Sequence, residues 1–398
     1  MGDANEATDE RVRIDRRGLF RWAGAAGMLG VAGAVTSCVA PWNGSGVTLP
    51  GVAGAVELPA GFTVRTIALG GVPIDSNGYS MPGFPDGAAT FADPAVAGGW
   101  YLVVNHELPA DGGVSSFRFA PDGTLLGASR ILSGTTLNCA GGPTPWGTWL
   151  SCEEYDWGRV WECDPTGSAP PAVRPAMGSF AHEAAAVAGD GRVYMTEDRG
   201  DGGFYRFTPS AAGDLTAGLL EVATGTAPGP VAWVEVPDPT GLPTLTRDQV
   251  PSTMTFDGGE GIDTLGDKVW FTTKGDDRVW EYSVAGSAVS LRYQGGGASM
   301  LADVDNLWVD DPSATLLVAE DGDDMQVVAI RPDNSLFQVV RVVGQEGSEI
   351  AGPCFSPDGQ RLYFSSQRAQ VGAVGSVGLP LGATYEVSGP FDTLLSRP

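Results

Sequence analysis

One stretch near the middle of the chain, residues 137–154, brings together residue types that bind metal ions. It reads LNCAGGPTPWGTWLSCEE, in which Cys139 precedes a pair of glutamates. A thiolate is a soft ligand that suits transition metals, whereas carboxylates are hard ligands that suit calcium. The stretch therefore predicts a metal site with mixed ligands. Because the whole chain has only two histidines, such a site must depend on carboxylates.

The stretch is one copy of a pattern that recurs along the chain. An apolar β-type run ends each time in a polar or acidic residue, at steps of 47, 44, 78, 45 and 46 residues. A period in the forties with several strands per repeat is typical of a β-propeller. We predict an all-β fold, a six-bladed β-propeller over residues 61–398, with an insertion at about 208–255 and a strand at 62–69 that closes the ring. The end residues are Glu107, Glu154, Asp198, Asp276, Asp321 and Gln367.

A second series of residues precedes these runs with nearly the same spacing. Equivalent positions of successive blades face one another across the central channel of a propeller. Five carboxylates and one thiol there would repel one another unless cations were bound. We therefore predict a metal cluster in the central channel, with solvated surface acids as the alternative. The series comprises Asp86, Cys139, Glu183, Glu260, Asp305 and Glu349.

The two histidines, His106 and His182, each adjoin a glutamate of these series. Successive side chains of a strand point to opposite faces. If the glutamates face the channel, the histidines point into the blades. We expect both to be hydrogen-bonded core residues.

The overall charge restricts the class of partner. Forty-eight acidic residues against 23 basic ones give a net charge of −25, which repels nucleic acid and attracts cations. We expect no nucleic-acid partner. A solvated acidic surface that favours solubility is the alternative explanation for most of the charge.

The first 38 residues resemble an export signal. The twin arginine Arg16-Arg17 is followed by a weakly apolar run rich in Ala and Gly, which predicts a twin-arginine signal peptide and transport by that export machinery. The protein is then expected at the cell surface, in the periplasm or outside the cell. Cys38 ends a sequence that resembles a lipoprotein cleavage box and would carry a lipid anchor, the only membrane contact expected; simple cleavage nearby is the alternative. Residues 39–60 are expected to form a flexible linker.

In the oxidising environment expected outside the cytoplasm, two further cysteines could form a disulfide. These are Cys152 and Cys163, which flank an expected hairpin. Two unpaired buried thiols are the favoured alternative. We expect a monomer.

Several motifs resemble those of the PhoX-type alkaline phosphatases, a family of exported six-bladed propellers. They span most of the chain after the signal, and the stretch at 137–154 is highly specific. The chain is identified as a short member of this family, which implies hydrolysis of small phosphomonoesters. The other motifs include Asn105-His-Glu107, Phe180-Ala-His-Glu183, Asp305-Asn-Leu-Trp308, Ala319-Glu-Asp321 and the run from Gly347 to Gly359.

The resemblance also implies a cluster of two ferric irons and three calcium ions that share an oxo bridge. Cys139 would be the thiolate ligand of iron. The other catalytic ligands, nearest the irons, would be Glu183, Glu260, Asp305 and Glu349. Calcium-binding or supporting positions would be taken by Glu107, Glu154, Asp198, Glu320 and Asp321.

Charge determines what such a cluster would do. A bare acidic channel would repel a phosphomonoester dianion, so the metals must reverse the local sign. They would bind phosphate oxygens and supply a metal-bound oxygen that attacks phosphorus in line. Three basic residues could clamp the phosphate, with a surface salt bridge as the alternative for each. These are Arg199, Lys274 and Arg368.

Two other functions are open on the sequence alone. A calcium-dependent propeller hydrolase of lactones or related esters would need no thiolate. A non-catalytic binding propeller would hold structural metals without turnover. The chain also departs from the family pattern at Gly258-Gly259 and at Arg368-Ala369, where larger members carry Arg-Pro and His-Pro. The residues that match the family's metal ligands are retained in this sequence, while these departures indicate altered substrate-binding residues.

Overall fold

The computed structural model describes residues 46–296, 299–322, 324–372 and 379–397. The chain divides into two units, residues 1–36 and 37–398. The expected signal peptide, the lipid site Cys38 and residues 39–45 of the expected linker lie outside the described residues. Within the described ranges, no helix has the length and apolar character needed to span a bilayer.

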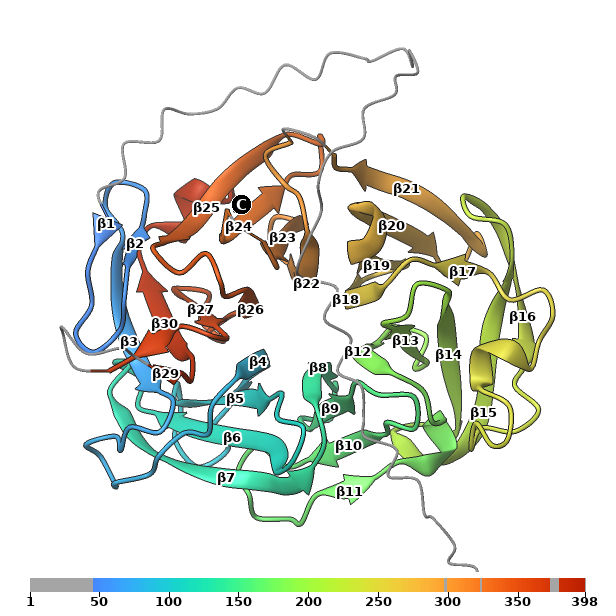
Figure 1. The fold of residues 1–398 in the computed structure, drawn as a ribbon, viewed down its shortest axis with the longest axis horizontal. Helices are drawn as coiled ribbons and strands as arrows, with labels where there is room; N and C mark the ends of the chain where they lie inside the picture. The colour runs from blue at the N-terminus through green and yellow to red at the C-terminus, as the bar shows by residue number, and fades with distance from the viewer. Residues whose placement is uncertain (1–45, 297–298, 323, 373–378, 398) are drawn as a thin grey trace, which may run out of the picture. The chain divides into compact units, whose positions relative to one another are not determined.

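The inner strands of the sheets lie around a common centre (Figure 1). Each packs against the next along the chain, and the last packs against the first, which closes the ring. Further antiparallel strands are added outwards from each. The six inner strands are β4 (Pro85–Ala92), β8 (Asn138–Pro143), β12 (His182–Val187), β18 (Gly259–Leu265), β22 (Val304–Asp310) and β26 (Ile350–Phe355).

Three of the sheets have four strands each. One of them joins the two ends of the described chain, because β3 pairs antiparallel with β30. The predicted closing strand at 62–69 is thereby confirmed. The sheets are β4 with β5 (Trp100–His106), β6 (Gly112–Phe119) and β7 (Leu125–Thr135); β8 with β9 (Trp149–Glu153), β10 (Val160–Cys163) and β11 (Ala172–Val173); and β26 with β27 (Arg361–Ser366), β30 (Ala383–Ser388) and β3 (Thr63–Leu69).

The third and fourth inner strands belong to one continuous ten-stranded sheet. It forms because β16 pairs with β21 through Gly229 and Pro230, and an unpaired edge strand readily accepts a neighbouring strand. The all-β, propeller-like arrangement is confirmed, whereas sheet pairing does not divide it into six separate blades. The sheet runs β12, β13 (Val193–Glu197), β14 (Gly202–Ala211), β15 (Asp214–Gly225), β16 (Gly229–Glu235), β21 (Ala288–Gln294), β20 (Arg278–Ser283), β19 (Lys268–Thr273) and β18, with β17 (Thr255–Phe256) beside β14.

The remaining large sheet has six strands and includes part of the expected linker. Residues 46–47 and 55–57 of this segment are strands, because β2 pairs with β25 and β1 pairs with β2. Val56 explains the ordering: it is 1% exposed in an apolar cluster with Leu317 and Val342. The sheet comprises β1 (Gly46–Val47), β2 (Ala55–Glu57), β25 (Leu336–Val343), β24 (Gln326–Ile330), β23 (Thr315–Glu320) and β22; the other short elements are η1 (Pro175–Met177), η2 (Thr246–Asp248), η3 (Lys274–Asp276), β28 (Gln370–Val371), β29 (Leu379–Pro380) and α1 (Phe391–Leu394).

Three of the described cysteines, Cys152, Cys163 and Cys354, and both histidines are buried in the blades. Cys152 and Cys163 are free and buried, as the favoured alternative predicted. Cys152 pairs with Val160 and Cys163 pairs with Trp149, which separates the two thiols by about 10 Å along the strands, beyond disulfide reach. His106 and His182 are both fully buried. His106 is hydrogen-bonded to Ser115 at 2.6 Å, and His182 to the Gly178 carbonyl at 3.2 Å.

Candidate metal centre

A repeated β-bulge directs one side chain of each of five inner strands. The strand register shifts between Pro85 and Ala88 in β4, and at the equivalent place in β8, β12, β18 and β22. A bulge re-aims the side chains within it. In β26 the bulge lies between Ala351 and Cys354, and Glu349 instead precedes the strand. The bulge residues are Asp86, Cys139, Glu183, Glu260 and Asp305.

A second set of side chains comes from the residue that directly follows the second strand of each repeat. In each repeat the last residue of that strand pairs with the first residue of the inner strand. The fourth repeat corrects the sequence prediction, because the residue in this place is Lys274 rather than Asp276. Asp276 instead accepts a hydrogen bond from Thr273 and pairs with Arg278 at 2.7 Å. The set is Glu107, Glu154, Asp198, Lys274, Asp321 and Gln367.

Nine of these acidic and thiol side chains, from both sets and Glu349, come together in four groups. Within each group the potential ligand atoms all lie within 4.8 Å of one another, and shared members connect the groups into one chain. We call these nine residues the metal ring. The groups are Asp86, Glu107 and Cys139; Cys139, Glu154 and Glu183; Glu183, Glu260 and Asp305; and Asp305, Asp321 and Glu349.

Asp86 enters the ring although the family resemblance did not point to it. Its signal in the sequence is its place in the second spaced series. Gln367 donates hydrogen bonds to Asp86 and, at 2.8 Å, to Glu107. The Gln367 amide therefore links two members of the ring.

Two residues predicted as metal-binding lie outside the four groups. Glu320 accepts a hydrogen bond from the backbone N–H of Ala302 at 3.0 Å, so its carboxylate supports the loop before β22. Asp198 stands beside the ring, where burial and then the charge of Asp198, among others, raise the pKa values of Glu154 and Glu260. Glu320 and its neighbour Asp321 differ because successive side chains of a strand point to opposite faces. Glu320 is the last residue of its strand, and Asp321, which follows it, faces the ring.

Oxygen atoms in the ring lack partners that their burial requires. Asp86 and Glu183 are each 1% exposed, and Oδ1 of Asp86 and Oε1 of Glu183 accept no hydrogen bond in the described structure. Burying a carboxylate oxygen without a partner is costly. A cation between these oxygens would remove the cost, so the residues present fit a bound metal.

Burial and mutual repulsion dominate the electrostatics on the Cys139 side. Burial, and then the charge of Glu107, raise the pKa of Asp86 to about 7. Burial, and then Asp86 and Glu183, raise the pKa of the Cys139 thiol well above its ordinary value. The side chain of Asn105 fixes this thiol's strand by donating to the carbonyls of Cys139 at 3.1 Å and Ala140 at 2.7 Å.

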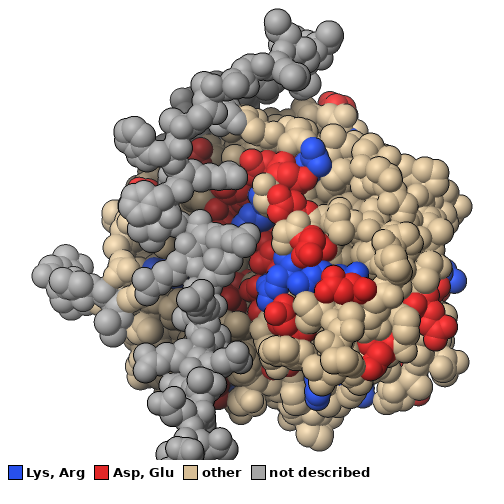
Figure 2. Space-filling view, turned by 45° about the vertical axis from the view of Figure 1, so that its right-hand side comes forward, with Lys and Arg blue, Asp and Glu red and all other residues tan. Residues whose placement is uncertain are grey.

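The Asp321 side of the ring contains its own cations. Lys274 Nζ lies 3.0 Å from Glu260 and 3.4 Å from Asp321, and Arg368 Nη2 lies 2.7 Å from Glu349 and 3.3 Å from Asp321. Although burial opposes the effect, these two charges lower the pKa of Asp321. All three predicted phosphate-binding bases therefore pair with acids at the ring, because Arg199 lies 3.5 Å from Glu154. Figure 2 shows Lys and Arg side chains set among acidic ones on this face.

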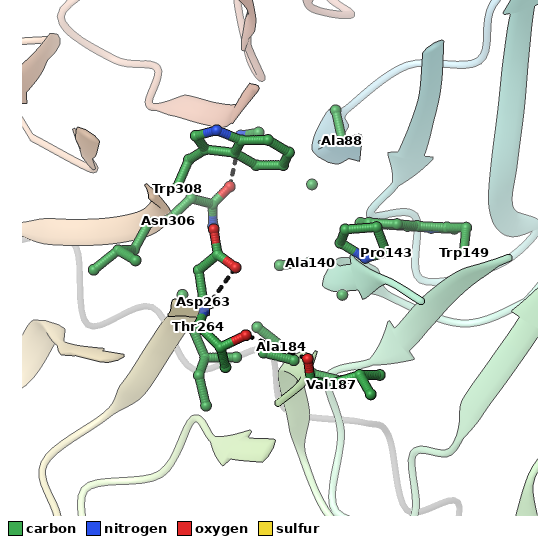
Figure 3. Close-up of a pocket in the computed structure, with 18 of the residues that line it drawn as sticks. Ala88, Ala140, Pro143, Trp149, Ala184, Val187, Asp263, Thr264, Asn306 and Trp308 are labelled. Carbon is green, nitrogen blue, oxygen red and sulfur yellow. Dashed lines mark hydrogen bonds between the residues drawn. The ribbon is translucent and has the colours of Figure 1, made fainter. Parts of the chain in front are cut away.

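The channel continues beyond the ring as a cavity of about 270 Å³. Figure 3 shows small side chains, including Ala88, Ala140 and Ala184, opposite Asn306 and Asp263. The two oxygens of Asp263 accept the N–H groups of Thr264 and Val309, each at 2.7 Å. This carboxylate holds β18 against β22.

Comparisons with known proteins agree with this arrangement. A family model described as alkaline phosphatase PhoX matches residues 126–159 and 155–268, a central part of the chain that contains Cys139, Glu183 and Glu260. No curated protein matches the sequence. The structure of Pseudomonas fluorescens PhoX in complex with vanadate, a transition state analogue, is similar with a TM-score of 0.71 at 18% identity, covering 87% of this chain and 98% of that one.

Two other solved structures are less similar. One, provisionally named a gluconolactonase, has a TM-score of 0.48 at 14% identity and covers 83% of this chain and 93% of its own. A protein of unknown function from Bacteroides thetaiotaomicron has a TM-score of 0.49 at 10% identity, with 86% and 83% covered. Neither likeness bears on function. Residues 126–268 thus match the family model of the alkaline phosphatase PhoX, and the chain has the fold of a solved PhoX structure.

Proposed function

We propose that the chain is an exported, metal-dependent phosphatase that hydrolyses small phosphomonoesters at the metal ring. The observation that carries the proposal is the ring itself, in which buried carboxylates and one thiol converge with unpartnered oxygens on Asp86 and Glu183. A structural role alone would not require so many like charges at one place. The family match supports the same reaction class.

The donor set indicates which ions the ring would hold. Cys139 supplies the one thiolate, which suits iron, and the carboxylates that make up the rest of the ring can bind iron or calcium. The family resemblance implies two ferric irons and three calcium ions. Following this resemblance, we assign the ligands nearest iron to Cys139, Glu183, Glu260, Asp305 and Glu349. We assign calcium-binding or supporting positions to Asp86, Glu107, Glu154 and Asp198, and a supporting position to Asp321. Bound ions supply positive charge for phosphate oxygens and lower the pKa of water, which is the chemistry that ester hydrolysis requires.

Three basic residues would bind and orient the phosphate group. The side chains of Arg199, Lys274 and Arg368 are 29%, 33% and 32% exposed, so each can reach a ligand at the ring. Each already contacts a ring carboxylate, which fixes its position before substrate arrives. Unused N–H groups of the guanidinium and ammonium groups remain for phosphate oxygens.

The wider assignment follows from the repeats and the N-terminal sequence. We count six blades from the six inner strands, with β16 and β21 joining two of them, over residues 61–398. Export by the twin-arginine machinery is supported by Arg16-Arg17. A location at the cell surface, in the periplasm or outside the cell, a lipid on Cys38 and a monomeric state complete the proposal.

The test is hydrolysis of a chromogenic phosphomonoester by purified protein loaded with iron and calcium, with and without chelator. We expect chelator-sensitive turnover, and a loss of about 100-fold in Cys139→Ser and Glu183→Gln, since each removes a ligand. Cys354→Ala is the matched control, because this thiol is buried in β26 away from the ring.

Three outcomes would contradict the proposal. Hydrolysis that survives complete removal of metal would exclude the ring as its source. Lactone hydrolysis by protein that holds calcium without iron would indicate the lactonase alternative. Stoichiometric metal with no turnover of any ester would indicate a binding propeller.

A further inference from the structure

The metal ring is asymmetric in its counter-charges. On the Cys139 side, oxygens of Asp86 and Glu183 are buried without partners. On the other side, both oxygens of Asp321 contact cations of the chain itself: Oδ2 lies 3.4 Å from Lys274, and Oδ1 lies 3.3 Å from Arg368. The same carboxylate chemistry therefore meets two different environments within one ring.

Lys274 occupies a place where the other repeats carry an acid or an amide. It directly follows β19, as Glu107 follows β5, Glu154 follows β9 and Gln367 follows β27. Its ammonium group bridges the fourth and fifth repeats, because it contacts Glu260 at 3.0 Å as well as Asp321. A fixed positive charge thus stands between two ring carboxylates from neighbouring repeats.

Arg368 completes this arrangement from the sixth repeat. Its Nη2 bridges Glu349 at 2.7 Å and Asp321 at 3.3 Å. The backbone N–H of Arg368 donates to Ser348 at 2.8 Å, which anchors the base of the side chain. Two cations of the chain therefore converge on Asp321, and a metal ion bound there would be repelled by both at short range.

We propose that Lys274 and Arg368 take the place of a metal ion at Asp321, so that Asp321 is not a metal ligand and metal binding is confined to the rest of the ring. The inference rests on the proposed function only in that the ring binds metal. It changes the expected metal content of this chain, because the counter-charge at Asp321 comes from the Lys274 and Arg368 side chains. That charge is present whether or not metal ions are available.

The experiment measures metal ions per chain by elemental mass spectrometry on full-length protein loaded with iron and calcium and then freed of excess metal. We expect Asp321→Asn to keep the wild-type metal content. Lys274→Met and Arg368→Gln should each gain about one calcium ion, because each frees carboxylate oxygens, whereas Lys274→Arg should gain none. Arg278→Met is the matched control, since Arg278 pairs with Asp276 outside the ring.

Loss of an ion in Asp321→Asn would overturn the inference, and so would unchanged metal content in both Lys274→Met and Arg368→Gln. If the cation variants fail to fold, the Asp321→Asn measurement decides alone. Wild-type protein without any bound metal would also overturn it. Because turnover is not measured, loss of the proposed phosphatase activity leaves these outcomes unaffected.

Discussion

The side-chain amide of Asn306 donates a hydrogen bond to Oδ1 of Asp305 at 3.0 Å, although the two residues are neighbours in sequence. The other end of the same amide accepts the backbone N–H of Gly352 at 2.6 Å. Asn306 thereby ties a ring carboxylate of β22 to the strand β26 of the next repeat. Partners of this kind fix the orientation of a metal-binding carboxylate.

We predict that Asn306→Ala weakens metal binding without abolishing it. Freed from Asn306, Asp305 would sample other orientations, and a loss of about 10-fold in metal affinity is expected. The measurement is a metal titration with competing chelator. Asn77→Ala is the control, since Asn77 donates to the Ala128 carbonyl outside the ring. Equal metal affinity in Asn306→Ala and wild type would contradict the positioning role.

Removal of metal should destabilise the fold in a pH-dependent way. Burial raises the pKa values of Asp86 and Asp305 from 3.8 to about 7. Carboxyls with raised folded-state pKa values favour folding below about pH 4 and lose that contribution as the pH rises through 7. Chelated protein should therefore unfold at a lower temperature at pH 8 than at pH 5.

The metal-loaded protein provides the comparison for this result. Bound cations compensate the ring charges, so its unfolding temperature should fall much less between pH 5 and pH 8. Thermal unfolding followed by circular dichroism measures both forms. A chelated protein as stable at pH 8 as at pH 5 would show that ring repulsion does not limit stability.

Asp263 should produce a smaller effect of the same sign, independent of metal. Burial raises its pKa from 3.8 to about 7, although the N–H groups of Val309 and Thr264 oppose the shift. Its contribution to folding is present below about pH 4 and is lost as the pH passes 7. We expect Asp263→Asn to gain about 2 kcal/mol in unfolding free energy relative to wild type between pH 5 and pH 8. Denaturant unfolding at the two pH values measures the change, and an equal difference at both would refute it.

A buried ion pair joins the end of β13 in the third repeat to the segment that contains Arg247. Arg247 Nη1 lies 2.8 Å from Glu197, and these side chains are 12% and 0% exposed. Glu197 also accepts the Tyr205 hydroxyl and the Gly203 N–H, each at 2.8 Å. Arg247→Met would leave a buried carboxylate without its cation, and about 3 kcal/mol of unfolding free energy should be lost.

The double variant Glu197→Gln with Arg247→Met separates the pair from its parts. Removing both charges should recover much of the loss, because the cost arises from the uncompensated carboxylate. Denaturant unfolding of the four proteins completes the cycle. Additive losses from the two single variants would mean that the pair is not coupled.

Spacing alone located much of the candidate site. The near-constant repeat marked Asp86, Cys139, Glu183, Glu260 and Asp305, and the structure brings all five into the metal ring. The reason is geometric, since equal spacing in a ring-forming repeat places equivalent residues at one level of the channel. A separate signal, the short strand pattern at 62–69, predicted the closing strand.

The repeat spacing could not decide which of several residues close together at the end of a strand faces the ring. The fourth repeat presents Lys274 and turns Asp276 away, and the fifth presents Asp321 while Glu320 supports a loop. Which of two adjacent side chains faces the channel depends on where the strand ends and where its bulge falls. Those points follow from packing against neighbouring repeats, which a one-residue shift in sequence does not reveal.

The sequence by itself determined the all-β repeat, the acidic character of the channel and the place of its one thiol, because these depend on residue type and period. Tertiary structure alone decided that β16 joins β21, that residues 46–57 extend a sheet, and that Lys274 and Arg368 converge on Asp321. Each of these contacts joins segments far apart in the chain. Their formation depends on which edges and charges the closed ring brings together, a property that no single repeat contains.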